Sequence, residues 1–229
     1  MESVIRVRSE DGLEIHTEAR GPISGEPVVL LHGWPDSAAL WRRQVPALVD
    51  AGHRVITVDQ RGFGRSDRPA ELSGYHVFHA MSDLSKVLDT HEIEQAHLVG
   101  HDWGAVPCWL LTMFAPERVR SLTPISVGHP TAFRRAGFEQ RRRSFYMLLF
   151  QFDRIAETWL TADDWSNLRD LAGRTTEWTL WMDRLAEPGA LTASLGWYRA
   201  NMAPDTLVAP ATDLPPVTRP TLGIIGSDD

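Results

Sequence analysis

The sequence predicts an α/β protein with a doubly wound, mostly parallel sheet and an inserted all-helical cap. Three observations predict this class. Short, continuous apolar segments alternate with segments of helical spacing over the first 129 residues. Residues 130–216 show helical spacing only, and residues 217–226 return to the pattern of a buried strand. We therefore expect a core formed by residues 1–129 and 217–229, with residues 130–216 as the cap.

The first two strands are predicted to form a hairpin. Alternating, β-branched segments occupy residues 4–8 and 14–19, and Asp11-Gly12 lies between them. An Asp-Gly turn between alternating segments is a strong hairpin signal. The pattern then changes at residues 28–31 and 55–58, which are continuous apolar runs. Strands covered by helices on both faces have this pattern, so the sheet is expected to become parallel there.

The following segments alternate between helix and strand. Apolar residues at helical spacing predict a crossover helix over residues 40–49 and further helices over residues 77–90 and 103–114. Strands are predicted over residues 96–100 and 120–127. This alternation is typical of a doubly wound sheet.

The composition of the 229-residue chain excludes several classes of function. A net charge of −7 argues against a nucleic-acid surface, and we interpret Arg134, Arg135 and the run 141–143 as a solvated face of the cap. The longest aliphatic run, residues 28–31, is far shorter than the roughly 20 residues that span a bilayer. A single cysteine, Cys108, excludes an internal disulfide and a CxxC zinc or redox site. We expect a cytoplasmic protein with no metal, nucleic-acid or membrane partner, compatible with a homodimer.

The sharpest chemical signal is Gly100-His101-Asp102-Trp103-Gly104, between a predicted strand and a predicted helix. Glycines on both sides of Asp102 permit the strained turn of a nucleophile elbow, with aspartate where serine usually stands. A carboxylate is ionised at neutral pH and attacks without a base to deprotonate it. It suits displacement at a saturated carbon, which gives an alkyl ester. The structural alternative is that Asp102 caps the helix that follows.

A second segment, His32-Gly33-Trp34-Pro35, directly follows a predicted strand. A glycine-containing turn there can direct the backbone N–H of Trp34 to the same point as the N–H of Trp103. Two such donors form an oxyanion hole. We interpret the ring of His32 itself as structural. The predicted substrate pocket is lined by His32, Pro35, Trp103 and Phe150.

Three segments together resemble the epoxide hydrolase branch of the α/β-hydrolase fold. They are His32-Gly33-Trp34-Pro35, residues 59–67 (DQRGFGRSD) and residues 100–105 (GHDWGA). The resemblance covers residues 8–229 and implies this fold, no cofactor, and a small apolar epoxide and water as substrates. It implies that Asp102 opens the epoxide to an enzyme-bound ester, which water hydrolyses to a vicinal diol. In this family the bond between Trp34 and Pro35 is usually cis.

Tyr146 and Tyr198 stand in contexts similar to the two cap tyrosines of that family. Ring opening creates an alkoxide, which a phenol of pKa about 10 can bind and protonate. Two core tyrosines without a chemical role are the alternative. A haloalkane or haloacid dehalogenase of the same fold is the second candidate activity, although a departing halide needs no pair of phenols. A non-catalytic, truncated product is the third candidate.

The resemblance also implies an acid and a histidine that hydrolyse the ester. Asp229 has the family's spacing for the acid, three residues after Gly226. The histidine is expected later in the chain, whereas the last histidine is His129. We therefore expect the last strand and helices of the fold to be missing. A chain without this base is expected to stall at the Asp102 ester.

Overall fold

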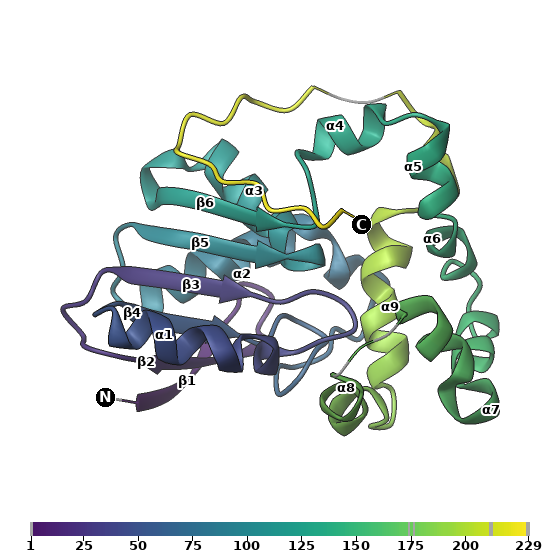
Figure 1. Ribbon diagram of the computed structural model, residues 1–229, viewed down its shortest axis with the longest axis horizontal. Helices are drawn as coiled ribbons and strands as arrows, with labels where there is room; N and C mark the ends of the chain where they lie inside the picture. Colours follow the sequence, from purple (N-terminus) through teal and green to yellow (C-terminus); the bar gives the residue numbers. More distant parts are fainter. Residues whose placement is uncertain (1, 174, 176, 211–212, 228–229) are drawn as a thin grey trace.

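Six strands of the described part of the chain form one mostly parallel sheet, in the order β1-β2-β4-β3-β5-β6 (Figure 1). The computed structural model describes residues 2–173, 175, 177–210 and 213–227. β1 and β2 form the predicted antiparallel hairpin, and β2 pairs antiparallel with β4. The other pairs are parallel, which confirms the predicted sheet. The strands are β1 (Glu2–Arg8), β2 (Glu14–Arg20), β3 (Pro27–Leu31), β4 (Arg54–Val58), β5 (Ala96–His101) and β6 (Val119–Ile125).

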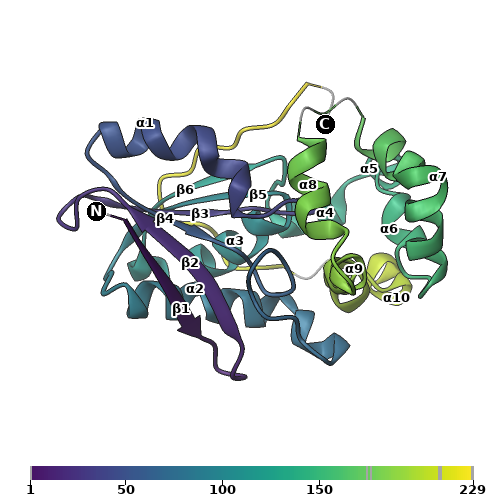
Figure 2. The ribbon, with the colours of Figure 1, turned by 90° about the horizontal axis from the view of Figure 1, so that it is seen from below.

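Helices cover both faces of the sheet, as the apolar strand pattern predicts. α1 (Gln44–Asp50) lies on one face, and α2 (Val77–Thr90) and α3 (Ala105–Phe114) lie on the other (Figure 2). The predicted bounds of α2 are confirmed. The other two helices start later than predicted because 3-10 turns at Ala38–Arg43 and Asp102–Gly104 precede them.

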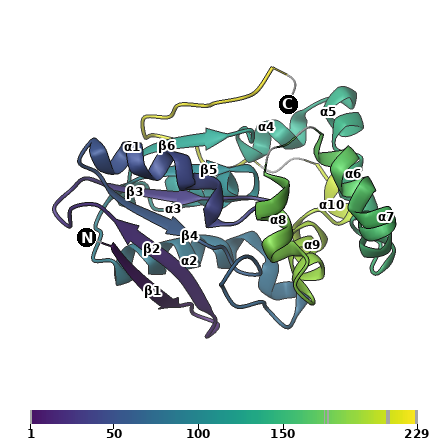
Figure 3. The same ribbon diagram turned by 60° about the horizontal axis from the view of Figure 1, so that its bottom comes forward.

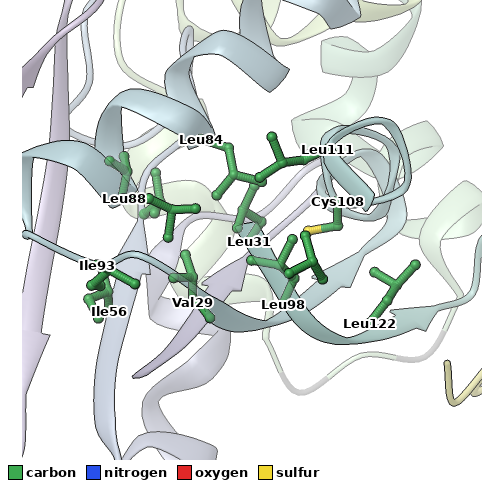
Figure 4. Close-up of a cluster of buried hydrophobic side chains, with 14 of the residues drawn as sticks. Val29, Leu31, Ile56, Leu84, Leu88, Ile93, Leu98, Cys108, Leu111 and Leu122 are labelled. Carbon is green, nitrogen blue, oxygen red and sulfur yellow. The ribbon is translucent and has the colours of Figure 1, made fainter. Parts of the chain in front are cut away.

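The main hydrophobic core lies between the sheet and the two helices α2 and α3 (Figure 4). Strand residues such as Leu31 and Leu98 pack against Leu84 of α2 and Cys108 of α3, all of them buried. Burial raises the pKa of the Cys108 thiol, so this cysteine stays protonated. The core fixes the positions at which β3 and β5 end, and the candidate site lies at those ends.

Among the described residues, seven helices follow β6 and lie beyond the carboxyl ends of the parallel strands (Figures 1 and 3). In the described part of the chain, none of the helices combines the length and the apolar character needed to span a bilayer. The prediction of helical structure up to residue 216 is wrong at its end, since no helix is described after Val208. The seven are α4 (Pro130–Arg135), α5 (Phe138–Arg143), α6 (Tyr146–Leu149), α7 (Ile155–Ala172), α8 (Trp178–Leu185), α9 (Ala190–Asn201) and α10 (Pro204–Val208).

Residues 217–226 are predicted to form a buried strand, but this prediction is wrong because most of the segment is exposed. The segment does run parallel beside β6, but through two isolated bridges, Leu122 with Thr221 and Ile125 with Ile224. Leu222 is 62% exposed. An apolar run is buried only where other elements pack on both of its faces, and the run by itself does not specify those elements.

A buried ionic network joins the hairpin to α2. The guanidinium of Arg61, 1% exposed, donates two hydrogen bonds of 2.7 Å to Asp83 on α2. It also donates to Asp11 in the β1–β2 turn, at 2.9 and 3.3 Å, and to the carbonyl of Gly74 at 2.6 Å. One side chain therefore holds together the β1–β2 turn, the backbone at Gly74 and α2.

This network predicts acid sensitivity through Asp11. Burial acts to raise the pKa of Asp11, but hydrogen bonds from Arg61 and Ser9 outweigh it and lower the pKa from 3.8 to about 2. A lowered pKa in the folded state stabilises the protein above pH 3.8, and that contribution disappears as the pH falls through about 2. We expect the free energy of unfolding to fall less steeply over this window in Asp11→Asn than in the wild type. Urea titrations at several pH values measure both slopes, and equal slopes would contradict the prediction.

Candidate active site

Asp102 occupies a strained elbow directly after β5. Its φ of +50° lies in the left-handed region, which is unfavourable for residues other than glycine. A Cβ atom on Gly100 would lie under 3.0 Å from the backbone of Gly104 and Ala105, and one on Gly104 would meet the backbone of Leu31. Both flanking glycines are therefore required by close backbone contact. The side chain of Asp102 does not cap α3, whose N-cap residue is Gly104.

Two backbone N–H groups hold the Asp102 carboxylate. The N–H of Trp34 donates to Oδ1 at 2.7 Å, and the N–H of Trp103 also bonds to the carboxylate. A Cβ atom on Gly33 would collide with the Asp102 side chain, so glycine is needed there as well. The peptide bond between Trp34 and Pro35 is cis, as expected. Burial raises the pKa of Asp102, and the two N–H groups act in the opposite direction.

Aromatic side chains from α6 and α9 surround this carboxylate. Tyr198, on α9, is buried, and its ring lies 5.1 Å from Trp103, 5.9 Å from Trp34 and 6.0 Å from Tyr146 of α6. The Tyr198 hydroxyl is hydrogen bonded to the side chains of Trp103 and Tyr146. Burial and the nearby Asp102 raise the pKa of Tyr198 well above 10. The phenol therefore stays protonated and can donate a hydrogen bond.

The remaining predicted site residues differ in their surroundings. Phe150 is fully buried between Trp34 and Tyr198, at ring distances of 5.1 and 4.9 Å. Pro35 is half-buried. Both nitrogens of the buried His32 ring are engaged, Nδ1 with the Gly33 carbonyl at 2.9 Å and Nε2 as acceptor from the N–H of Gln60 at 3.2 Å. Asp229 lies outside the described residues.

Two polar residues that position α9 escaped the sequence analysis. Ser194 accepts a hydrogen bond from the indole N–H of Trp34 at 3.1 Å. Asn201 accepts from the N–H of Val77 at 3.0 Å and donates to the carbonyl of Tyr75 at 2.9 Å. Spacings of three and four residues from Ser194 to Asn201 place both on the helix side that faces the core. This spacing of polar residues on the core side of a helix could have identified both residues from the sequence.

The geometry combines a carboxylate, two backbone N–H donors and two phenols in one aromatic cluster. This set can perform nucleophilic displacement with proton donation to a leaving oxygen. Among the described residues, no three His, Cys, Asp or Glu side chains are placed to share a metal ion.

Residues 26–227 match the family described as alpha/beta hydrolase fold. The AB hydrolase superfamily protein YfhM of Bacillus subtilis is 34% identical over 201 residues, which are 83% of this chain and 70% of that protein. Epoxide hydrolase A of Mycobacterium tuberculosis is 35% identical over 175 residues, 73% of this chain and 54% of that protein. The chain thus spans little more than half the length of that enzyme.

Solved structures agree with this result. The crystal structure of a Bacillus megaterium epoxide hydrolase in complex with an inhibitor superposes with a TM-score of 0.81. Its sequence is 26% identical, and the match covers 97% of this chain and 82% of that one. An elbow after β5 and a family match over nearly nine-tenths of the sequence lead to one assignment. The chain belongs to the α/β hydrolase fold family.

Proposed function

We propose that this protein acts as an epoxide hydrolase-type enzyme with Asp102 as its nucleophile. The observation that carries the proposal is the placement of the Asp102 carboxylate, held by the N–H of Trp34, in one cluster with Tyr146 and Tyr198. The relatives named epoxide hydrolases support the same activity. We also propose that residues 130–216 form a cap that covers the site.

The first step is a displacement at a saturated carbon. A carboxylate oxygen of Asp102 forms a bond to one epoxide carbon, and the bond between that carbon and the epoxide oxygen breaks. The electron pair goes to the oxygen, which Tyr146 and Tyr198 bind as it becomes an alkoxide and then protonate. The aromatic side chains around Asp102 favour an apolar epoxide.

The second step is hydrolysis of the ester. Water gives a proton to a base as it attacks the ester carbonyl, and the N–H groups of Trp34 and Trp103 stabilise the resulting oxyanion. Collapse of this intermediate breaks the bond from the carbonyl carbon to the diol oxygen, which takes up a proton, and restores the Asp102 carboxylate. Asp229 is our candidate for the acid that orients a histidine base. His32 is excluded as this base, because both of its ring nitrogens are engaged.

Intact mass spectrometry of the 229-residue chain after exposure to styrene oxide tests both steps. We expect a mass increase of one substrate in rapidly quenched samples, which peptide mapping assigns to Asp102. Diol accumulation would show that the ester is also hydrolysed, with His101 as the first histidine to substitute. A folded chain that gives neither product would refute the proposed function, and halide release from a chloroalkane would favour the dehalogenase.

Removal of both phenols is expected to slow ring opening. In the double variant Tyr146→Phe, Tyr198→Phe the rings still pack, but the alkoxide loses its proton donors, so ester formation should slow by about 10²–10⁴-fold. The rate of the mass increase measures this effect. Tyr75→Phe is the matched control, because Tyr75 is also buried but its hydroxyl bonds to the carbonyl of Pro69. An equal effect of the control would contradict the prediction.

A further inference from the structure

The helices α5, α6 and α7 lie on the side of the molecule away from the sheet (Figures 1 and 2), and large apolar side chains are exposed along them. These side chains belong to α5, to α6 and the turns on either side of it, and to the first turns of α7, and they are between 36 and 79% exposed. Large exposed apolar side chains that gather in one segment mark an interaction site. We call this set the outer apolar face: Phe138, Phe145, Leu148, Phe152, Ile155 and Trp159.

The spacing groups the members of this face within each half of the segment. Steps of three and four residues lead from Phe145 through Leu148 to Phe152, and a step of four leads from Ile155 to Trp159. Arg154, with a φ of +63°, interrupts the helical backbone between the two halves. Residues three and four apart are neighbours on a helical surface.

The same segment has the opposite charge to the rest of the molecule. Residues 130–159 carry six arginines and three acidic residues, a net charge of +3 in a chain of −7, which leaves −10 for the remainder. Arg154 is 92% exposed, and Arg142 is 63% exposed with only an exposed pair to Glu139. Exposed pairs of this kind contribute little, so these cations remain available to an anionic partner.

We propose that the outer apolar face docks on the surface of an anionic lipid bilayer. Aromatic and aliphatic side chains beside arginines are typical of helices that lie in a membrane interface, where apolar burial and attraction to anionic lipids add together. A second copy of the chain is disfavoured, since a symmetric contact would bring two basic segments together. Docking of this kind needs no helix that spans the bilayer, and it replaces the expectation of no membrane partner, which rested only on the short aliphatic runs.

This inference rests on the proposed function and names its substrate class. Within α6 and the turn after it, Leu148 and Phe152 face outward, whereas Tyr146 and Phe150 pack against Tyr198 in the site. One short segment therefore separates the candidate site from the docked surface. The substrates are apolar epoxides dissolved in the lipid phase.

Vesicle sedimentation tests the docking without any need for catalysis. We expect the chain to sediment with phosphatidylcholine vesicles that contain phosphatidylglycerol, to bind pure phosphatidylcholine weakly, and to be released by salt. The triple variant Phe138→Ser, Phe152→Ser, Ile155→Ser should lower binding by about tenfold or more. Replacement of Arg141, Arg142 and Arg143 by Gln should remove the preference for phosphatidylglycerol.

The matched control is Val4→Ser, Ile23→Ser, Leu72→Ser, which removes three exposed apolar side chains elsewhere and should leave binding unchanged. Circular dichroism verifies that each variant is folded. Equal binding by the apolar triple variant and the wild type, or no binding by the folded wild type, would overturn the proposal. A dimer in light scattering that the apolar variant dissociates would assign the face to a second copy instead. Ester formation with water-soluble glycidol is measured separately, so failure there concerns the proposed function alone.

Discussion

Asp102→Asn is expected to abolish formation of the covalent ester, with a rate loss of about 10⁴-fold or more. Asparagine keeps the shape of the side chain, and its amide oxygen can still accept the hydrogen bond that the N–H of Trp34 donates at 2.7 Å. The amide has no negative charge and is a poor nucleophile. The substitution therefore removes the reacting group and leaves the elbow intact. Intact mass after exposure to styrene oxide measures the effect.

The control for this variant is Asp170→Asn, at an exposed position of α7, which should form the ester as the wild type does. Thermal unfolding of both variants tests whether the fold is retained. A persistent ester in Asp102→Asn would show that another residue is the nucleophile, and the mechanism proposed above would then be wrong.

Arg61→Leu is expected to cost about 3–5 kcal/mol in the free energy of unfolding, because it leaves a buried carboxylate without its partner. Asp83 is 8% exposed and receives two of its hydrogen bonds from Arg61. The carbonyl of Arg61 also accepts a hydrogen bond from the indole of the buried Trp197 at 3.0 Å, so the same loop supports α9. Urea unfolding followed by circular dichroism measures the loss.

A second substitution separates the ionic effect from the loss of side-chain volume. In Arg61→Leu, Asp83→Leu the buried carboxylate is removed with its partner and the remaining carboxylate, Asp11, is 32% exposed, so part of the lost stability should return. Arg65→Leu, at a half-exposed ion pair with Glu18, should cost less than about 1 kcal/mol. Equal losses in the free energy of unfolding for Arg61→Leu and Arg65→Leu would show that burial of the ion pair does not determine its cost.

Local patterns predicted the sheet, the helices that cover it and the elbow. β3 and β4 are continuous apolar runs, and this pattern predicted strands that helices bury on both faces of the sheet. The glycines around Asp102 were informative because a backbone contact excludes every other residue there. Tyr146 and Tyr198 lie close together in the structure. The family motifs around them predicted this, whereas their spacing in the sequence did not.

Other features depend on partners that one segment does not specify. The kink in α7, where Asp163, Asp164 and Trp165 have positive φ, has neither proline nor glycine to announce it. The apolar segment at residues 217–226 has the composition of a buried strand, but its burial depends on neighbouring elements. The Arg61 network joins three separate segments, and each of its members in isolation resembles an ordinary surface charge.

The glycines of the elbow also bear on how such an enzyme can be redesigned. Backbone atoms of two loops fix the Asp102 carboxylate so closely that Gly33, Gly100 and Gly104 leave no space for a methyl group. Libraries that vary these loops will consist mainly of inactive proteins. The helices from α6 to α9 supply the other walls of the site through side chains, which can be exchanged singly. Directed evolution for new substrates should therefore randomise the helical half and leave the nucleophile loops untouched.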